Sequence, residues 1–192
     1  MTSGKSTDDA AQIHPRDEIV LHLKPMRAFA LSLTRDMARA DDLVQDTVVK
    51  AWTNIDKFTA GTNMRAWLFT ILRNTFYSER RKAKREVADV DGVMTERVAV
   101  KPAHDGNLAL AEFRRAFEQL PAEQREALIL VGAQGFAYEE AARMCNCAVG
   151  TVKSRANRGR KRLAEMLDMH EDDAMELTDQ ATVAVISRNP GT

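Results

Sequence analysis

The stretch YEEAARMCNCAVGTVKSRANRGRKRL, residues 138–163, carries the clearest indication of the fold. Its spacing predicts a short helix over Tyr138–Cys145, whose paired alanines let a second helix approach closely. Asn146 can adopt the left-handed conformation that a tight turn needs. A longer helix then follows over Val149–Met166, with Val152 on its inner face. A short helix, a tight turn and a longer helix are typical of a helix-turn-helix motif.

The second helix of this motif is strongly basic. No acidic residue occurs between Arg143 and Leu163, where there are seven cations: Arg143, Lys153, Arg155, Arg158, Arg160, Lys161 and Arg162. A run of charge is commonly no more than a solvated face. Because this run coincides with a helix-turn-helix pattern, we expect cations to neutralise phosphates while the first half of the helix reaches base edges.

Two cysteines in the turn, Cys145 and Cys147, raise the alternative of a metal site. A structural zinc site needs four ligands. None of the four histidines (His14, His22, His104 and His170) stands at a ligand spacing from the pair. We therefore expect both cysteines to act as small hydrophobic residues in a turn, with no metal and no other cofactor.

The composition of the whole chain limits the class of protein. Of its 192 residues, 44% are hydrophobic, and 28 cations balance 28 anions, so net charge indicates no partner. The chain has no run of about 18 apolar residues, the length that a helix needs to cross a membrane. The beginning of the chain lacks the apolar core of a signal peptide, and two cysteines make no disulfide framework. We expect a cytoplasmic protein without membrane contact.

Apolar residues at helical spacing predict an all-α fold of two small helical domains. In the first, we expect a helix from Asp17 that Pro25 kinks or divides, a second helix with Asp41 or Asp42 near its beginning, and a third from Met64. The expected organisation is a disordered N-terminus (1–16), a first domain (17–86), a flexible linker (87–106), a second domain (107–167) and an acidic C-terminal tail (168–192).

These segments resemble extracytoplasmic-function (ECF) sigma factors of bacterial RNA polymerase. ADDLVQDTVVKAWTNIDKF (40–58) with NMRAWLFTILRNTFYSERRK (63–82) resembles their region 2, and LPAEQREALIL (120–130) with the helix-turn-helix resembles their region 4. YEEAARMC (138–145) and CAVGTVKSR (147–155) look most like the alphaproteobacterial general-stress subgroup. The resemblance implies a subunit that directs polymerase to promoters. Its first domain would dock on the polymerase clamp and open the −10 element, while the second reads the −35 element as duplex.

The resemblance also implies a role for individual residues. The −35 contacts match Lys153, Ser154, Arg155, Asn157, Arg158 and Arg160. The −10 contacts match Phe58, Thr59, Asn63, Arg65, Asn74, Arg80 and Arg81. The contacts to core polymerase match Asp42, Gln45, Asp46 and Lys50. In addition, cations on the third helix alternate with the aromatic residues Trp67, Phe69, Phe76 and Tyr77. Cations together with aromatic rings suit the binding of a separated DNA strand. Trp67 and Phe76, however, share the apolar stripe of the helix, so we expect them in the core.

The partners implied are promoter DNA, the clamp and flap of core RNA polymerase, and a small helical anti-sigma factor like NepR. Apolar patches near Leu43–Trp52 and Leu120–Leu130 are its expected landing sites. The acidic tail either folds back onto the basic helix or only solvates the chain.

A decoy, a helix-turn-helix repressor and an enzyme are the alternatives to a sigma factor. A sigma-like decoy would bind the anti-sigma factor without reading DNA, but it needs no basic helix. A helix-turn-helix repressor leaves the first domain unexplained. An enzyme lacks support, because no nucleophile motif, phosphate loop or small-molecule substrate site is evident.

Overall fold

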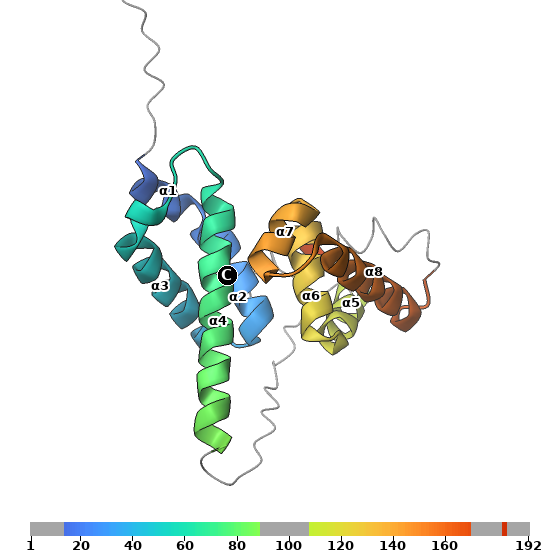
Figure 1. Ribbon diagram of the computed structural model, residues 1–192. Helices are drawn as coiled ribbons and strands as arrows, with labels where there is room; N and C mark the ends of the chain where they lie inside the picture. The colour runs from blue at the N-terminus through green and yellow to red at the C-terminus, as the bar shows by residue number, and fades with distance from the viewer. Residues whose placement is uncertain (1–13, 89–107, 170–181, 184–192) are drawn as a thin grey trace, which may run out of the picture.

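The structure, a computed structural model, describes residues 14–88, 108–169 and 182–183, and none of these residues forms a strand. Figure 1 shows two groups of helices side by side. The first comprises α1 (Pro15–Leu21), α2 (Leu23–Thr34), α3 (Met37–Thr53), the 3-10 helix η1 (Ile55–Lys57) and α4 (Met64–Ala88). The second comprises α5 (Leu108–Gln119), α6 (Ala122–Leu128), the π-helical turn η2 (Ile129–Ala133), α7 (Tyr138–Cys145) and α8 (Val149–Met166). The predicted all-α fold with two small helical domains is confirmed.

The first predicted helix is divided before its proline rather than at it. α1 ends at Leu21 and α2 begins at Leu23, so that Pro25 lies in the first turn of α2, where a missing N–H costs no hydrogen bond. His14 caps α1, because its Nδ1 accepts a hydrogen bond from the N–H of Arg16 at 3.2 Å. The last two residues of the predicted disordered N-terminus are therefore helical, while residues 1–13 lie outside the described part of the chain.

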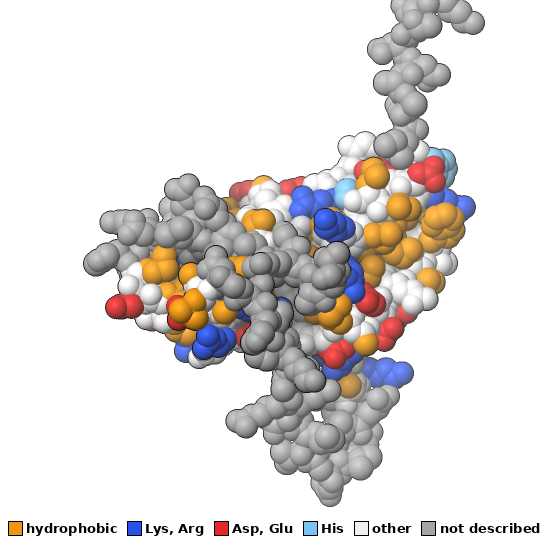
Figure 2. All heavy atoms as spheres, turned by 180° about the vertical axis from the view of Figure 1, so that it is seen from behind, with side chains coloured by type: hydrophobic (Ala, Val, Ile, Leu, Met, Phe, Trp, Pro, Cys, Tyr) orange, Lys and Arg blue, Asp and Glu red, His pale blue; other side chains and the backbone are white. Residues whose placement is uncertain are grey.

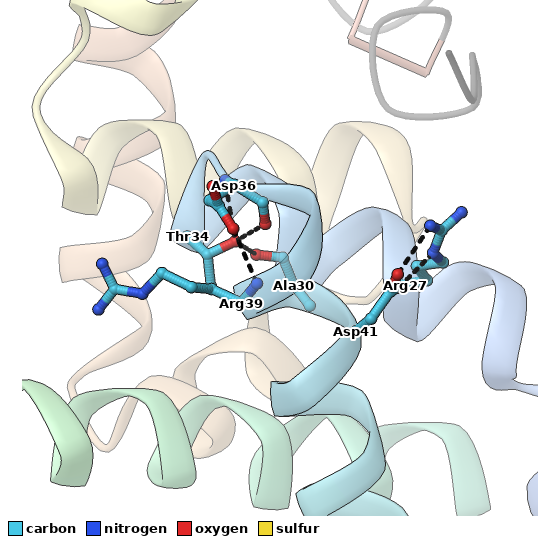
Figure 3. A network of polar contacts seen from close by, with 6 residues as sticks. All are labelled: Arg27, Ala30, Thr34, Asp36, Arg39 and Asp41. Carbon is cyan, nitrogen blue, oxygen red and sulfur yellow. Dashed lines mark hydrogen bonds and ion pairs between the residues drawn. The ribbon is translucent and has the colours of Figure 1, made fainter. Parts of the chain in front are cut away.

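A network of polar contacts fixes the turn between α2 and α3 (Figure 3). Arg35 ends α2 in the left-handed conformation, with φ of 59°. Asp36 begins α3 as its N-cap, its carboxylate accepting a hydrogen bond from the N–H of Arg39 at 2.8 Å. The hydroxyl of Thr34 lies 3.0 Å from the carbonyl oxygen of Ala30 and 2.9 Å from that of Asp36. Each of these contacts is local.

α3 begins at Met37 with Asp36 as its N-cap, so that Asp41 and Asp42, expected near the beginning of this helix, lie in its second turn. Asp41 instead pairs with Arg27 of α2, whose Nη2 lies 3.0 Å from Oδ2 (Figure 3). Hydrogen bonding to that guanidinium lowers the pKa of Asp41. The carboxylate thus joins α2 to α3.

In the second domain, α7 and α8 have the predicted bounds, and Asn146 between them is left-handed with φ of 50°. α8 packs closely on α6. A Cβ added at Gly159 would lie 2.9 Å from Cδ1 of Leu128, nearer than real Cβ atoms come to a neighbour. Glycine at this position therefore allows the close approach of α8 to α6, and a larger residue would have to displace the Leu128 side chain. This packing orients the remaining faces of α8 toward solvent.

The two domains share one continuous hydrophobic core. Phe69 of α4 stacks on Phe29 of α2 at 5.0 Å between ring centroids, and on its other side meets Phe136, which precedes α7, at 5.2 Å. α4 contacts α7, and α2 contacts α6. The domains are thus packed against each other by their side chains. Figure 1 shows α7 beside α4.

The structure describes only the beginning of the predicted linker and a small part of the predicted acidic tail. α4 continues to Ala88, so the first two residues of the predicted linker are helical, and 89–107 lies outside the described residues. Most of the predicted acidic tail also lies outside them, although Thr182 within it is helical and fully buried.

Across residues 14–88, 108–169 and 182–183, no helix has the length and apolar character needed to span a membrane. The same residues include no cluster of three metal-ligating side chains.

Candidate nucleic-acid and polymerase interface

Five of the six expected −35 residues lie on the accessible side of α8, away from its buried residues. Val152, Ala156 and Leu163 are buried on the inner face. Lys153, Asn157 and Arg158 are exposed, and Ser154 and Arg155 are half-buried beside them. The structure thus brings five of the six expected residues onto one accessible helix face, with donors suited to phosphates and base edges.

Arg160, the sixth expected residue, is placed differently. It is only 8% exposed and belongs to the buried residues of α8, with Val152, Ala156 and Leu163. In this arrangement it offers little surface to a duplex. Its expected contact remains a prediction.

The expected −10 loop follows η1 and leads into α4. The ring of Phe58 lies 5.3 Å from that of Trp67 and is half-buried, while Thr59 is exposed. Gly61 has φ of 83°, a conformation that side chains rarely adopt. Asn63 caps α4, because its Oδ1 accepts a hydrogen bond from the N–H of Ala66 at 3.1 Å. The loop is therefore short, capped and accessible at Thr59.

The remaining −10 residues are spread along α4. Asn74, Arg80 and Arg81 are exposed, and the guanidinium of Arg80 lies 5.7 Å from the ring centroid of Phe76. Arg65 is half-buried and faces the second domain. Trp67 is half-buried against the core and Phe76 is buried, as expected for core residues.

Phe69 is not available to a DNA strand. It is fully buried between Phe29 and Phe136, so its expected role as a stacking aromatic is wrong. Tyr77 is half-buried, and its hydroxyl donates a hydrogen bond to Glu126 at 3.3 Å. Burial, followed by the charge of Glu126, raises the pKa of Tyr77 to about 12. Both rings serve packing between the domains.

The expected polymerase-contacting residues share the exposed face of α3. Asp42, Gln45, Asp46 and Lys50 are all exposed. Nζ of Lys50 lies 3.1 Å from the hydroxyl of Thr75, so this ammonium also ties α3 to α4. In the described part of the chain, no side-chain hydrogen bond or ion pair engages Asp42, Gln45 or Asp46, so these three exposed side chains of α3 are accessible to a partner.

An apolar surface that the sequence only partly indicated adjoins this face. Val49 and Trp52 are exposed on α3, as are Val20 and Leu21 on α1, and Figure 2 shows hydrophobic side chains gathered on this side of the molecule. The expected patch around Leu43–Trp52 is therefore exposed at its later end, although Leu43 itself is buried. The expected patch at Leu120–Leu130 is wrong, because its leucines are buried in the core.

Between the domains lies a set of polar contacts that sequence reasoning missed. Nε of Arg73 on α4 lies 2.8 Å from Oε1 of Glu126 on α6, and Glu126 is 1% exposed. Burial would lower the pKa of Arg73, but the charge and hydrogen bonds of Glu126 outweigh burial and raise it. Because Leu120–Leu130 was expected to be a patch open to a partner, nothing in the sequence indicated that Glu126 would be buried or that Arg73 would pair with it.

Two further contacts connect residues that belong to the −10 prediction. Nη2 of Arg65 lies 2.6 Å from both the carbonyl oxygen and the side-chain oxygen of Gln134. Nδ2 of Asn63 donates to Oε1 of Glu140 on α7 at 2.8 Å. Burial lowers the pKa of Arg65. Both side chains expected to meet DNA thus contact the second domain.

Comparison with known proteins supports the division into two domains. The family model of Sigma-70 region 2 matches residues 19–86, and that of Sigma-70, region 4 matches residues 110–163. The chain is 51% identical over 175 residues to the ECF RNA polymerase sigma factor EcfG of Rhodopseudomonas palustris, covering 91% of this chain and 96% of that protein. It is 31% identical over 162 residues to the ECF sigma factor SigM of Bacillus subtilis, covering 82% and 98%.

Solved structures show the same arrangement of helices. The sigma factor RpoE of Bartonella quintana, in complex with the anti-sigma factor NepR, is similar at a TM-score of 0.70 and 55% identity, over 80% of this chain and 96% of that one. The complex of PhyRSL with NepR from Sphingomonas sp. Fr1 is similar at a TM-score of 0.62, over 81% and 90%. Its identity is 18%, so this second likeness concerns the fold alone.

Proposed function

Because the chain belongs to the extracytoplasmic-function family of RNA polymerase sigma factors, we propose that it acts as a general-stress member whose two domains read two promoter elements. It is a transcription initiation factor that directs core RNA polymerase to promoter DNA. The observation that carries the division of labour is the exposed row of Lys153, Asn157 and Arg158 on α8. The protein acts in the cytoplasm and catalyses no reaction of its own.

The first domain, residues 17–86, binds core polymerase and the −10 strand. The exposed face of α3 binds the clamp through Asp42, Gln45 and Asp46, and the loop ending at Asn63 with the basic side of α4 holds the separated strand. Phosphates are neutralised there by exposed Arg80 and Arg81. The cost of extracting a base, a few kcal/mol, must be offset by this surface.

The second domain, residues 107–167, reads the −35 element as duplex. α8 enters the major groove with Lys153 and Arg158 toward phosphates and guanines and Asn157 toward bases. Linking two weak readers in one chain makes the second contact intramolecular, so the pair binds a composite promoter more tightly than either domain alone.

An anti-sigma factor holds the protein inactive between stresses. The support is the 55% identity to RpoE of Bartonella quintana, which was solved with NepR. The apolar surface of Val20, Leu21, Val49 and Trp52 suits the apolar face of a small helical partner. Occupation of this surface would also cover the neighbouring clamp-binding face of α3.

The alternative is a decoy that binds the anti-sigma factor and leaves DNA alone. Its only structural support is the likeness to the PhyRSL complex, which concerns the fold. A decoy has no use for an exposed basic recognition helix, whereas a sigma factor needs one. The retained cations on α8 therefore favour the sigma factor.

Transcription in vitro tests the proposal. Core RNA polymerase is supplied with a promoter library, with and without the full chain, and start sites are mapped. We expect the chain to create a defined set of starts preceded by common −35 and −10 sequences. Start sites that do not change when the chain is added would overturn the proposal, and tight NepR binding without transcription would support the decoy.

A further inference from the structure

The contacts between the two domains involve the same side of α4 that the proposed function assigns to the −10 strand. Asn63 and Arg65 belong to the expected −10 set, yet each is bonded to the second domain. Arg73 lies two turns further along the same helix and is paired with Glu126. Asn63 and Arg65 are therefore shared between the second domain and a DNA strand along α4, and Arg73 extends the domain contact along the same helix.

Arg65 contacts the second domain through two hydrogen bonds and an aromatic ring. Its guanidinium donates to two oxygens of Gln134, each at 2.6 Å, and lies 4.6 Å from the ring centroid of Phe136. Gln134 closes the π-helical turn η2 by donating its N–H to the carbonyl oxygen of Ile129 at 2.8 Å. The irregular turn thus presents a carbonyl, an amide oxygen and an aromatic ring to one cation. A phosphate that approached Arg65 would have to displace all three.

Glu126 makes the domain contact specific. Its carboxylate is almost fully buried, and both side chains that bond it in the described part of the chain, Arg73 and Tyr77, come from α4. A buried carboxylate is tolerated only while it is paired. Separation of the domains would break the bonds of Glu126 to Arg73 and Tyr77. These bonds therefore favour the packed arrangement of the two domains.

We propose that this interface is an autoinhibitory latch, in which Glu126, Gln134 and Glu140 of the second domain occupy Arg73, Arg65 and Asn63. The latch obstructs the part of the −10 face that Asn63 and Arg65 form, while Asn74, Arg80 and Arg81 stay exposed. The inference rests on the proposed function, because it concerns regulation of the same DNA-binding face. The −35 face stays open, since Lys153, Asn157 and Arg158 remain exposed in the closed arrangement. Opening is sterically feasible, because segment 89–107 would reach about 60 Å if extended.

The latch makes an asymmetric prediction about the two promoter elements. If the binding-competent open form is only partly populated, apparent affinity for the −10 strand is reduced by that fraction. Affinity for −35 duplex is not reduced, because α8 is accessible in both forms. A variant that weakens the latch should therefore bind the −10 strand more tightly and the −35 duplex with unchanged affinity.

The test uses Glu126→Gln in the full chain, with Glu123→Gln as its matched control. Both changes remove one carboxylate from α6, but Glu123 is exposed and Glu126 is buried. Radius of gyration is measured by small-angle X-ray scattering. Binding to a labelled −10 single strand and a −35 duplex is measured by fluorescence anisotropy. We expect Glu126→Gln to be larger and to bind the −10 strand at least about fivefold more tightly, with duplex affinity unchanged.

A second variant guards against a folding defect. Gln134→Ala removes one acceptor of Arg65 without touching the buried pair, and it should give the same changes in smaller measure. The latch is overturned if circular dichroism shows both variants folded but neither gains affinity for the −10 strand, or if Glu123→Gln gains as much. Failure of the wild type to direct transcription would instead count against the proposed function, so the two failures are distinguishable.

Discussion

Burial sets the chemistry of individual side chains here more than residue type does. Cys145 and Cys147 stand two residues apart, yet Cys145 is buried and Cys147 is half-exposed. Burial, followed by the charge of Glu126, raises the pKa of the Cys145 thiol to about 12. The turn therefore contains one shielded thiol and one accessible thiol.

Alkylation of the native protein at pH 8 should distinguish the two thiols. A pKa near 12 reduces the thiolate fraction of Cys145 on the order of a thousandfold relative to an ordinary thiol. We expect iodoacetamide to modify Cys147 first, with peptide mass spectrometry locating the label. Both thiols should react alike in denaturant, and equal rates in the native protein would contradict the burial of Cys145.

Arg158 provides a residue-scale test of the recognition helix. Replacement by alanine should weaken −35 duplex binding by about 1–3 kcal/mol, because an exposed guanidinium that contacts a base edge or phosphate is lost. Binding to core polymerase should not change. Arg115→Ala, which removes an exposed cation from α5, is the control and should have little effect. Loss of both DNA and polymerase binding in Arg158→Ala would refute the division between domains.

At the scale of single elements, the helices are defined by their ends. Asp36 and Asn63 cap α3 and α4 with side-chain oxygens. α8 differs, because Ala148 occupies its N-cap position and offers no side-chain acceptor. α8 therefore begins without a side-chain cap for the N–H groups of its first turn.

Ala148→Ser should supply the missing cap. A serine at this position is expected to raise the free energy of unfolding by about 1 kcal/mol, because its hydroxyl oxygen accepts a hydrogen bond from the first turn. Urea denaturation followed by circular dichroism measures the change. Ala83→Ser, on the exposed side of α4, is the control and should destabilise slightly through helix propensity. A serine at 148 that is no better than one at 83 would show that the helix is capped by other means.

At the scale of the whole molecule, the domains form one packed unit with a shared core and a buried ion pair across the interface. Interfaces within a chain couple the unfolding of domains when they are large and apolar. The ion pair of Arg73 and Glu126 adds to the free energy that holds the two domains together, and this contribution is lost when the domains separate.

Calorimetry should reveal this coupling. We expect the wild type to unfold in a single transition, whereas Glu126→Gln unfolds in two, because removing one partner of a buried pair costs about 3–5 kcal/mol of the interface. Glu123→Gln should behave like the wild type. One unchanged transition in both variants would mean that the apolar contacts around Phe69 and Phe136 suffice to couple the domains.

The sequence by itself determined the helices, their division into two domains and the composition of the reading helix. These depend on local features: the period of apolar residues, the left-handed Asn146, and the run of cations on α8. Asp41 and Asp42 were expected near the beginning of α3, but Asp36 was not identified as its N-cap, because only geometry shows which acid accepts a hydrogen bond from the first turn.

Only the tertiary structure decided what the side chains of α4 do. Phe69, Arg65 and Asn63 have the types expected of DNA contacts, yet one is core and two meet the second domain. Their partners lie many residues away, beyond the reach of periodicity or spacing. Long-range pairing depends on how two amphipathic surfaces fit together, and that fit is a property of the folded chain.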